Sequence, residues 1–377
     1  MFISDVATLH DFCTLARREK VLAVDTEFIR ERTYFPQLCL LQLGTHEETA
    51  AVDTLALDKD DLAPVAELLA DDGITKVFHA CRQDLEVISG TLGCVPSPIF
   101  DTQLAAAFLG HRHQIGYGAL VKDMCGVSLP KASSLTDWAR RPLDEDQLSY
   151  AEDDVRYLPE MYDRMWGELA EKDRLSWVMP EMEALAAEGG SSREPRSAYV
   201  HLKRAGMLTR RQLAIAREVC AWRERAAAKR NIPRKWVIGD EVIVEICRRA
   251  PKDTARLKRI RGTDQLSSRA ATSLVRCVRE GLDSDPSTYP VAKRRERPSA
   301  EVEGVLDLMY ATLRLVSERS GVATQVIASR DDLLDKVQGR PGRLDRGWRG
   351  ELAGAQLDRL LSGEVGLTVR GGKIELL

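Results

Sequence analysis

Val21-Leu22-Ala23-Val24-Asp25-Thr26-Glu27 is the stretch that decides the fold, because it ends an apolar run on two carboxylates. The apolar run predicts a buried β-strand, in which residues two apart point to the same face. Asp25 and Glu27 are therefore expected to project together, with Thr26 turned away. An unpaired carboxylate in an apolar setting carries a heavy desolvation cost, and no matching run of lysine or arginine stands beside these acids. The stretch thus indicates a strand end that binds cations.

Asp84 and Asp154 complete a set of four carboxylates within the first 154 residues. Asp84 follows a second apolar strand after a short connection. Asp154 stands four residues after Tyr150 at the start of a helical pattern, and side chains four apart share one face of a helix. The neighbouring Glu152 and Asp153 lack this spacing and are interpreted as surface charges.

Oxygen ligands of this kind predict a site for hard divalent cations. Mg²⁺ and Mn²⁺ prefer carboxylate oxygens, and two such ions about 4 Å apart can clamp the attacking and leaving oxygens of a phosphoryl displacement. We therefore expect two divalent ions, Mg²⁺ or Mn²⁺, held by Asp25, Glu27, Asp84 and Asp154. Tyr150 is expected to orient the attacking water by a hydrogen bond.

Three further residues are candidates for contacts with a substrate, and each has a structural alternative. Phe28 is expected either to stack on a terminal base, since stacking tolerates any base, or to pack in the core. His79 is interpreted either as a substrate contact or as a packed, backbone-bonded histidine. Lys131 and the Arg140-Arg141 pair flank the third acidic group and are expected either to touch phosphates or to be solvated. Asp101, in contrast, directly precedes a helical stretch and is predicted to be its N-cap.

The acidic groups resemble the three exonuclease motifs of the DEDD superfamily, in its tyrosine-bearing branch. The matching residues are Asp25-x-Glu27, Asp84 and Tyr150-x3-Asp154. Similarity to the bacterial ribonuclease D family is carried by the intervening residues 32–43, 100–103 and 136–138, and the resemblance covers nearly the whole chain. Leu135 departs from the pattern, because a polar or basic residue often precedes Thr-Asp-Trp in that family.

The resemblance implies an α/β fold and an activity on RNA. Its exonuclease domain is ribonuclease H-like, a mixed sheet flanked by helices, and is followed here by two small all-α domains. The implied reaction is metal-dependent 3′–5′ exoribonuclease cleavage that releases nucleoside 5′-monophosphates. The implied substrates are single-stranded 3′ ends, above all the 3′ trailers of transfer-RNA precursors.

The order of the patterns agrees with that fold. Apolar runs predict strands over residues 21–27, 37–44, 50–55 and 75–80. Helical periodicity predicts helices over residues 61–70, after Arg82, and over residues 101–109 and 143–170. Strands first and helices later fit a mixed sheet flanked by helices.

Glycine, serine and proline together at residues 188–195 mark a break in the chain, so the exonuclease domain is expected at residues 1–190. Residues 205–285 resemble the helicase-and-ribonuclease-D C-terminal (HRDC) domain, a helical nucleic-acid-binding unit. Its predicted helices cover residues 208–230, a segment starting at Pro233, residues 242–246 and a stretch around residues 257–262. Residues 299–377 resemble a second, degenerate HRDC-like domain, and its last residues, 366–377, favour a hairpin.

Charge divides the chain more sharply than its net of −3 suggests. Residues 1–192 hold 17 lysines and arginines against 34 acids, residues 193–298 hold 27 against 12, and residues 299–377 hold 11 against 12. An acidic part joined to a strongly basic part is typical of a catalytic body with a phosphate-binding arm.

The composition, 44% apolar and 30% charged, predicts a protein with a substantial core. The eight cysteines include no Cys-x-x-Cys pair, which is typical of buried thiols in a reducing compartment. No start like a signal peptide and no long uncharged apolar run occurs. We therefore expect a cytoplasmic protein without a membrane partner, and no obligatory protein partner is evident.

Two other functions remain open from the residues. A DNA-directed 3′–5′ exonuclease would use the same four acids, because discrimination of RNA needs a contact to the 2′-hydroxyl. A catalytically inactive RNA-binding scaffold is the other alternative, although such relatives usually lose one or more acids. A helicase is excluded, because the chain contains no Gly-x4-Gly-Lys-Ser/Thr loop.

Overall fold

The computed structural model describes residues 1–130, 136–190, 194–291 and 298–377. The chain forms two compact units. The first comprises residues 1–28, 38–190 and 297–377, and the second comprises residues 29–37 and 191–296. Residues 297–377 therefore pack with residues 1–28 and 38–190, and the basic segment forms a unit of its own. Within the described residues, no helix combines the length and the apolar character needed to cross a bilayer.

The first unit is built on a six-stranded mixed sheet, and this confirms the expected fold class. Strand order is β1-β4-β3-β2-β5-β6. β2 pairs in parallel with β5, β5 with β6, and β1 with β4, whereas β3 and β4 are antiparallel. The strands are β1 (Phe2–Ile3), β2 (Val21–Ile29), β3 (Gln37–Gly44), β4 (Thr49–Val52), β5 (Thr75–Phe78) and β6 (Ile99–Asp101).

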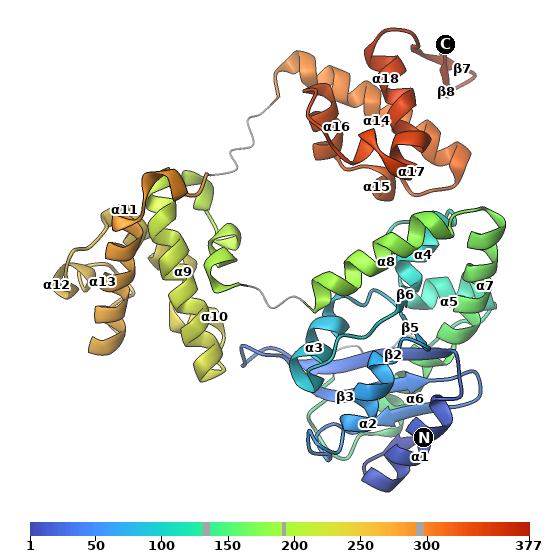
Figure 1. Cartoon of the computed structure of the whole chain (residues 1–377), viewed down its shortest axis with the longest axis horizontal. Coiled ribbons are helices and arrows are strands. Elements are labelled where there is room, and N and C mark those ends of the chain that lie inside the picture. The colour runs from blue at the N-terminus through green and yellow to red at the C-terminus, as the bar shows by residue number, and fades with distance from the viewer. Residues whose placement is uncertain (131–135, 191–193, 292–297) are drawn as a thin grey trace. The chain divides into compact units, whose positions relative to one another are not determined.

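Helices surround this sheet (Figure 1). They are α1 (Val6–Ala16), α2 (Ala63–Ala70), α3 (Arg82–Leu92), α4 (Thr102–Phe108), α5 (Tyr117–Cys125), α6 (Glu145–Arg156), α7 (Leu158–Glu171) and α8 (Leu175–Gly189). α6 packs tightly on the sheet at Gly44, where an added Cβ would lie 3.1 Å from the carbonyl oxygen of Val155 and 3.3 Å from Cβ of Ala23. Ala23 lies two residues before Asp25, so α6 covers the face of β2 that carries the acids.

The C-terminal part of the first unit is helical and ends in a hairpin. Its elements are α14 (Ala300–Ser320), α15 (Thr324–Ile327), α16 (Arg330–Val337), a 3₁₀ turn (Arg343–Asp345), α17 (Gly347–Arg349), a π-helical turn (Gly350–Gly354), α18 (Ala355–Leu361), β7 (Leu367–Arg370) and β8 (Lys373–Leu376). β7 and β8 are antiparallel, with Gly371 and Gly372 at φ +56° and +79° in the turn. These angles suit a hairpin turn that glycine adopts readily, and they confirm the predicted hairpin.

An aromatic and ionic contact joins this C-terminal part to α8. The Trp348 indole stacks on Trp177 with ring centroids 5.3 Å apart and an interplanar angle of 11°. Arg349 is buried and donates to Glu181 Oε1 at 2.6 Å and to the Val326 carbonyl at 3.2 Å. The contact is thus both apolar and charged, and it includes a guanidinium whose hydrogen bonds stay inside the protein.

The second unit is helical around its own core. Its elements are two 3₁₀ helices (Pro195–His201 and Ala205–Met207), α9 (Arg210–Arg230), α10 (Arg234–Val237), α11 (Asp240–Arg249), α12 (Thr254–Leu257), α13 (Ser268–Asp283) and a 3₁₀ turn (Pro286–Thr288). The helix predicted around residues 257–262 is wrong: α12 already ends at Leu257. The Thr263 hydroxyl donates to the carbonyls of Leu257 and Ile260, both at 2.8 Å, and Gly262 has φ +89°, so the chain turns there.

Candidate metal centre

Three of the four predicted carboxylates converge at one point of the first unit. Asp25 and Glu27 lie on β2, and Asp154 lies on α6. One oxygen from each lies within 4.8 Å of the other two. The alternation of the strand brings the first two to one face, and the packing of α6 on that face adds the third.

Asp84, the fourth carboxylate, lies in the first turn of α3 and is only 8% exposed. The Thr26 hydroxyl donates a hydrogen bond to its Oδ1 atom. Thr26 is itself buried and stands between Asp25 and Glu27 in sequence. The sequence did not predict this contact, and its one sequence signal is a hydroxyl residue in the middle of the acidic motif.

Burial raises the pKa values of all four acids, and the charges of nearby acids add to the effect. Burial raises the pKa of Asp25 well above its usual value, and the charges of Asp84, Asp154 and Glu27 add to the effect. Burial, with the charges of Asp154 and Asp84, raises the pKa of Glu27 to about 8. Burial also raises the pKa of Asp154 to about 7 and that of Asp84 to about 6, although hydrogen bonds from Tyr150 and Thr26 oppose these shifts. The cluster therefore favours any cation that relieves the repulsion.

The donor atoms of this cluster fit a divalent metal. Every potential ligand is a carboxylate oxygen, the donor that Mg²⁺ and Mn²⁺ prefer. Asp154 Oδ2 is buried and has no hydrogen-bond partner among the described residues. A buried polar atom without a partner is costly, so this oxygen is suited to accept a metal ion.

Tyr150 lies beside Asp154, as their spacing on α6 predicts. The Tyr150 hydroxyl and the Asp154 carboxylate each affect the pKa of the other. Burial and the charges of Asp154 and Glu27 raise the pKa of Tyr150 above its usual value, so the phenol stays protonated. Its ring is tilted against the buried indole of Trp138, with centroids 6.0 Å apart.

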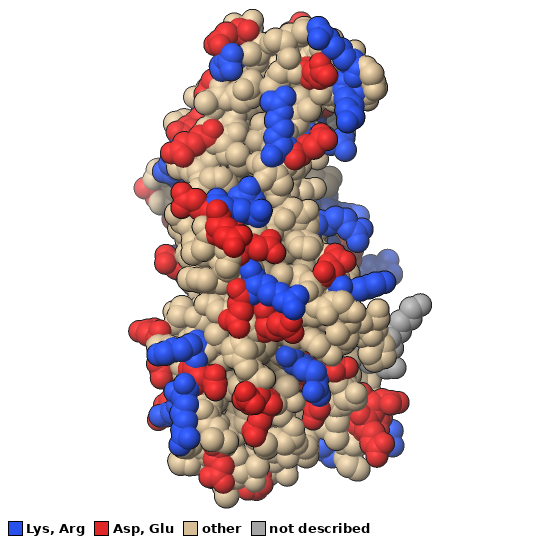
Figure 2. Space-filling view, turned by 90° about the vertical axis from the view of Figure 1, so that its right-hand side faces the viewer, with Lys and Arg blue, Asp and Glu red and all other residues tan. Residues whose placement is uncertain are grey.

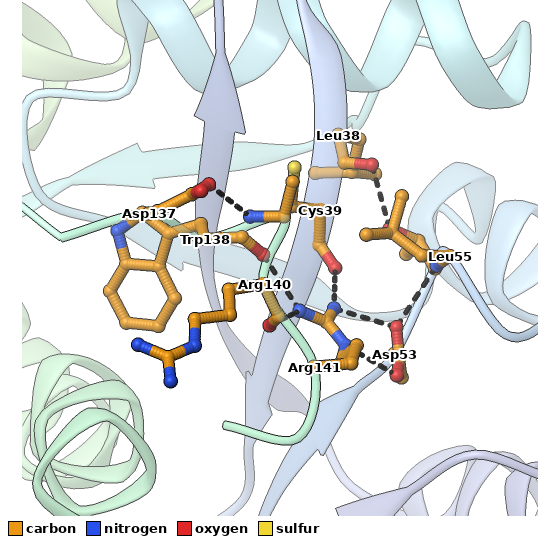
Figure 3. A network of polar contacts seen from close by, with 10 residues as sticks. Leu38, Cys39, Asp53, Leu55, Asp137, Trp138, Arg140 and Arg141 are labelled. Carbon is orange, nitrogen blue, oxygen red and sulfur yellow. Dashed lines mark hydrogen bonds and ion pairs between the residues drawn. The ribbon is translucent and has the colours of Figure 1, made fainter. Parts of the chain in front are cut away.

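The Trp138 segment is held by Arg141 (Figure 3). Arg141 forms a two-pronged ion pair with Asp53, with Nε and Nη2 both 2.7 Å from its carboxylate oxygens. The guanidinium also donates to the carbonyls of Cys39 at 2.8 Å and Trp138 at 2.7 Å. Arg141 is thus a structural group and not a free phosphate contact. Figure 3 shows the Arg140 guanidinium without any such bond.

The Asp101 carboxylate accepts hydrogen bonds from backbone amides at the starts of two helices. It caps α4 by accepting from the amides of Gln103 at 2.9 Å and Leu104 at 3.1 Å, which confirms the predicted N-cap. It also accepts from the amides of Ala80 at 3.2 Å and Cys81 at 2.8 Å, just before α3. The buried carboxylate therefore fixes the entry of the helix that carries Asp84.

The other predicted residues have the following surroundings. Both ring nitrogens of His79 have partners inside the chain, the Thr102 hydroxyl at 2.9 Å and the Ile115 carbonyl at 3.0 Å. These bonds favour the packed histidine over the substrate contact. Phe28 is partly buried and packs against the core of the first unit. Lys131 and Leu135 lie outside the described residues.

The raised pKa values predict how the metal-free protein responds to pH. The ordinary values are 4.5 for Glu27 and 3.8 for Asp154, against about 8 and about 7 in the fold. Between these limits the folded state binds more protons than the unfolded state, so the free energy of unfolding falls as pH rises from about 4 to about 8. A bound divalent ion replaces those protons, so Mn²⁺ is expected to raise Tm more at pH 8 than at pH 5.

Thermal melts in chelator and in Mn²⁺ at both pH values measure this effect. In the Asp25→Asn variant the gain from Mn²⁺ should shrink, because one ligand charge is gone. An equal gain at the two pH values, or a gain that Asp25→Asn leaves intact, would place the metal elsewhere.

Comparisons with known proteins find relatives that match the whole length of this chain. A family model described as 3′-5′ exonuclease matches residues 1–170, and one described as HRDC domain matches residues 212–270. Ribonuclease D of Acidiphilium cryptum is 37% identical over 100% of this chain and 97% of its own length. Ribonuclease D of Granulibacter bethesdensis is 38% identical over 99% and 94%. The crystal structure of Escherichia coli RNase D, described as an exoribonuclease involved in structured RNA processing, matches with a TM-score of 0.82 at 30% identity, over 96% of this chain and 98% of that one.

Proposed function

The chain belongs to the ribonuclease D family of 3′–5′ exoribonucleases, and we propose that it trims the 3′ ends of structured RNA precursors, transfer-RNA precursors among them. The observation that carries the proposal is the cluster formed by Asp25, Glu27 and Asp154, with Asp84 beside it. The four acids would hold two divalent ions, Mg²⁺ or Mn²⁺. When bound, such ions activate water and stabilise the leaving 3′-oxygen of a phosphodiester.

The side chains around the acids have positioning roles in this proposal. Tyr150 lies four residues before Asp154 on α6 and remains a hydrogen-bond donor, because its raised pKa keeps the phenol protonated. It can therefore orient an attacking water but cannot remove its proton. Thr26 holds Asp84, and Asp101 fixes the start of α3 on which Asp84 sits.

The two alternative functions are less well supported. A DNA-directed exonuclease would have the same acids, but the relatives that match over the full length are ribonucleases. An inactive scaffold would not need to bring Asp25, Glu27 and Asp154 together with Asp84 and Tyr150 close by. Cleavage of matched RNA and DNA single strands separates the first alternative from the proposal.

We expect the second unit to bind RNA. Residues 193–298 carry 27 basic against 12 acidic residues. On the face of the molecule shown in Figure 2, basic and acidic side chains are interspersed, and no extended area of one sign is visible. Phosphate contacts by the basic unit would make affinity fall with salt, because bound counterions are released.

A time course on a 5′-labelled hairpin RNA with a single-stranded 3′ extension tests the function. With Mn²⁺ or Mg²⁺, we expect a descending ladder in steps of one nucleotide that slows at the base of the stem, with nucleoside 5′-monophosphates as the other product. Excess chelator should stop the ladder, and a matched DNA should be cut more slowly. Cleavage within the strand, or full activity in chelator, would contradict the proposal.

A further inference from the structure

Two large aromatic side chains of the second unit are exposed next to the C-terminal end of α9. Phe35, in the segment of residues 29–37, is 51% exposed, and Trp236, on α10, is 53% exposed. Neither belongs to the apolar core of the unit or to the packing against it. Exposed aromatic surface at two neighbouring elements is typical of a binding site.

Asn231 fixes the first of these residues. It ends α9 in the left-handed conformation, at φ +46°. Its Oδ1 atom accepts hydrogen bonds from the amides of Tyr34 and Phe35, both at 3.1 Å. The Tyr34 hydroxyl donates to Glu224 Oε2 at 2.8 Å, and the Tyr34 ring meets that of Phe35 edge to face with centroids 4.9 Å apart. The Phe35 ring is therefore held in place although half of it faces solvent.

Trp236 is fixed in a similar way. α10 follows the end of α9 directly and packs beside it (Figure 1). The amide of Trp236 donates to the Pro233 carbonyl at 2.8 Å, and the next residue, Val237, is buried in the core. This anchoring leaves the indole outside on a rigid turn, so little conformational entropy would be lost when a ligand stacks on it.

Four basic residues stand near the two aromatic residues in sequence. Arg32, Lys229, Arg230 and Lys235 are exposed, and in the described parts of the chain none of these four forms an ion pair. The nearest buried acid, Glu224, is already engaged by Tyr34 and by Arg234 at 3.6 Å. The segments that carry the two exposed rings therefore also carry exposed, unpaired positive charge. Aromatic rings and cations together complement a single-stranded nucleic acid.

We propose that Phe35, Trp236 and the four cations form a stacking platform that binds single-stranded RNA upstream of the 3′ end being cleaved. This inference rests on the proposed function, which supplies RNA as the substrate. The rings stack on bases without regard to sequence, because every base has a π-face. The cations contact the phosphates and set the salt dependence. The platform is formed by two segments that lie far apart in sequence. Neither segment would form it alone.

Titration of the full-length protein with labelled poly(U), in chelator to prevent cleavage, tests the platform. Trp236→Ala and Phe35→Ala are each expected to raise Kd about fivefold or more without changing the salt slope. Trp236→Phe should keep most of the affinity, because a smaller aromatic ring still stacks. Lys235→Gln should flatten the slope of log K against log salt by about 0.7. Tyr310→Ala is the control, since Tyr310 is an exposed aromatic residue of the first unit at 39%.

The outcomes separate this inference from the proposed function. Cleavage of a trinucleotide should be unchanged in both alanine variants, because the platform acts upstream of the site. An unchanged Kd for poly(U) in both variants would overturn the platform while leaving the exonuclease intact. An equal loss of affinity for poly-glutamate would overturn RNA as the occupant and favour an acidic peptide. Circular dichroism of each variant checks that the helical unit is folded.

Discussion

Asp25→Asn is expected to lower the rate of RNA cleavage by about a thousandfold or more while RNA affinity stays within about twofold of wild type. The variant keeps the shape of the side chain but removes one ligand charge from the cluster with Glu27 and Asp154. Metal ions contribute several kcal/mol of transition-state stabilisation, and each 1.36 kcal/mol corresponds to tenfold in rate. The measurement is the ladder assay on 5′-labelled RNA in Mn²⁺, with binding measured separately in chelator.

Asp153→Asn is the matched control for this effect. Asp153 is the neighbour of Asp154 on α6, but it pairs with Arg156 at 3.5 Å and does not belong to the cluster. Its variant should cleave at nearly the wild-type rate. Equal losses in the two variants would mean that negative charge in general, and not a defined ligand set, supports catalysis.

Arg141→Ala is expected to lower the free energy of unfolding of the first unit by about 3–5 kcal/mol, because it leaves the buried Asp53 carboxylate without its partner. Burial by itself would raise the pKa of Asp53, but the hydrogen bonds from Arg141 bring it below its usual value. The variant should also lower the cleavage rate, since the carbonyl of Trp138 loses its donor and Trp138 supports Tyr150. Urea denaturation and the ladder assay measure the two effects.

Arg140→Ala is the control in the same turn. Its guanidinium forms no ion pair with any described residue, so the variant should unfold like wild type. Arg141→Lys should recover little, because an ammonium group cannot reproduce the planar fork that meets Asp53. Loss of stability in Arg140→Ala, or full recovery in Arg141→Lys, would show that the network is held by charge alone.

The parts of the fold and site that depend on local periodicity could be predicted from the sequence. The alternation of β2 predicted that Asp25 and Glu27 share a face, and the spacing of four predicted the contact between Tyr150 and Asp154. The mixed sheet is confirmed, as are the α4 cap and the terminal hairpin. The full set of metal ligands remains a prediction.

The features that depend on tertiary contact could not be predicted. Strands β1 and β6 have only 2 and 3 residues, too few for a period to show. Nothing near Arg141 in sequence indicates Asp53, which lies 88 residues away. Residues 299–377 were predicted as a separate domain from their resemblance, but the stacking of Trp348 on Trp177 is invisible to any local pattern.

Because residues 29–37 and 191–296 together form the second unit, the chain passes between the two units four times, and the basic unit is not a tail with one free end. These connections reduce the volume that the unit can explore, which raises the effective concentration of any strand it holds for its own chain. The same topology determines the order in which the two units can fold during synthesis. The contact between Arg349 and Glu181 spans 168 residues, so the first unit is completed only when the last residues leave the ribosome. Most of the basic unit can fold before that point, and nascent chains would then be able to bind RNA before they are able to degrade it.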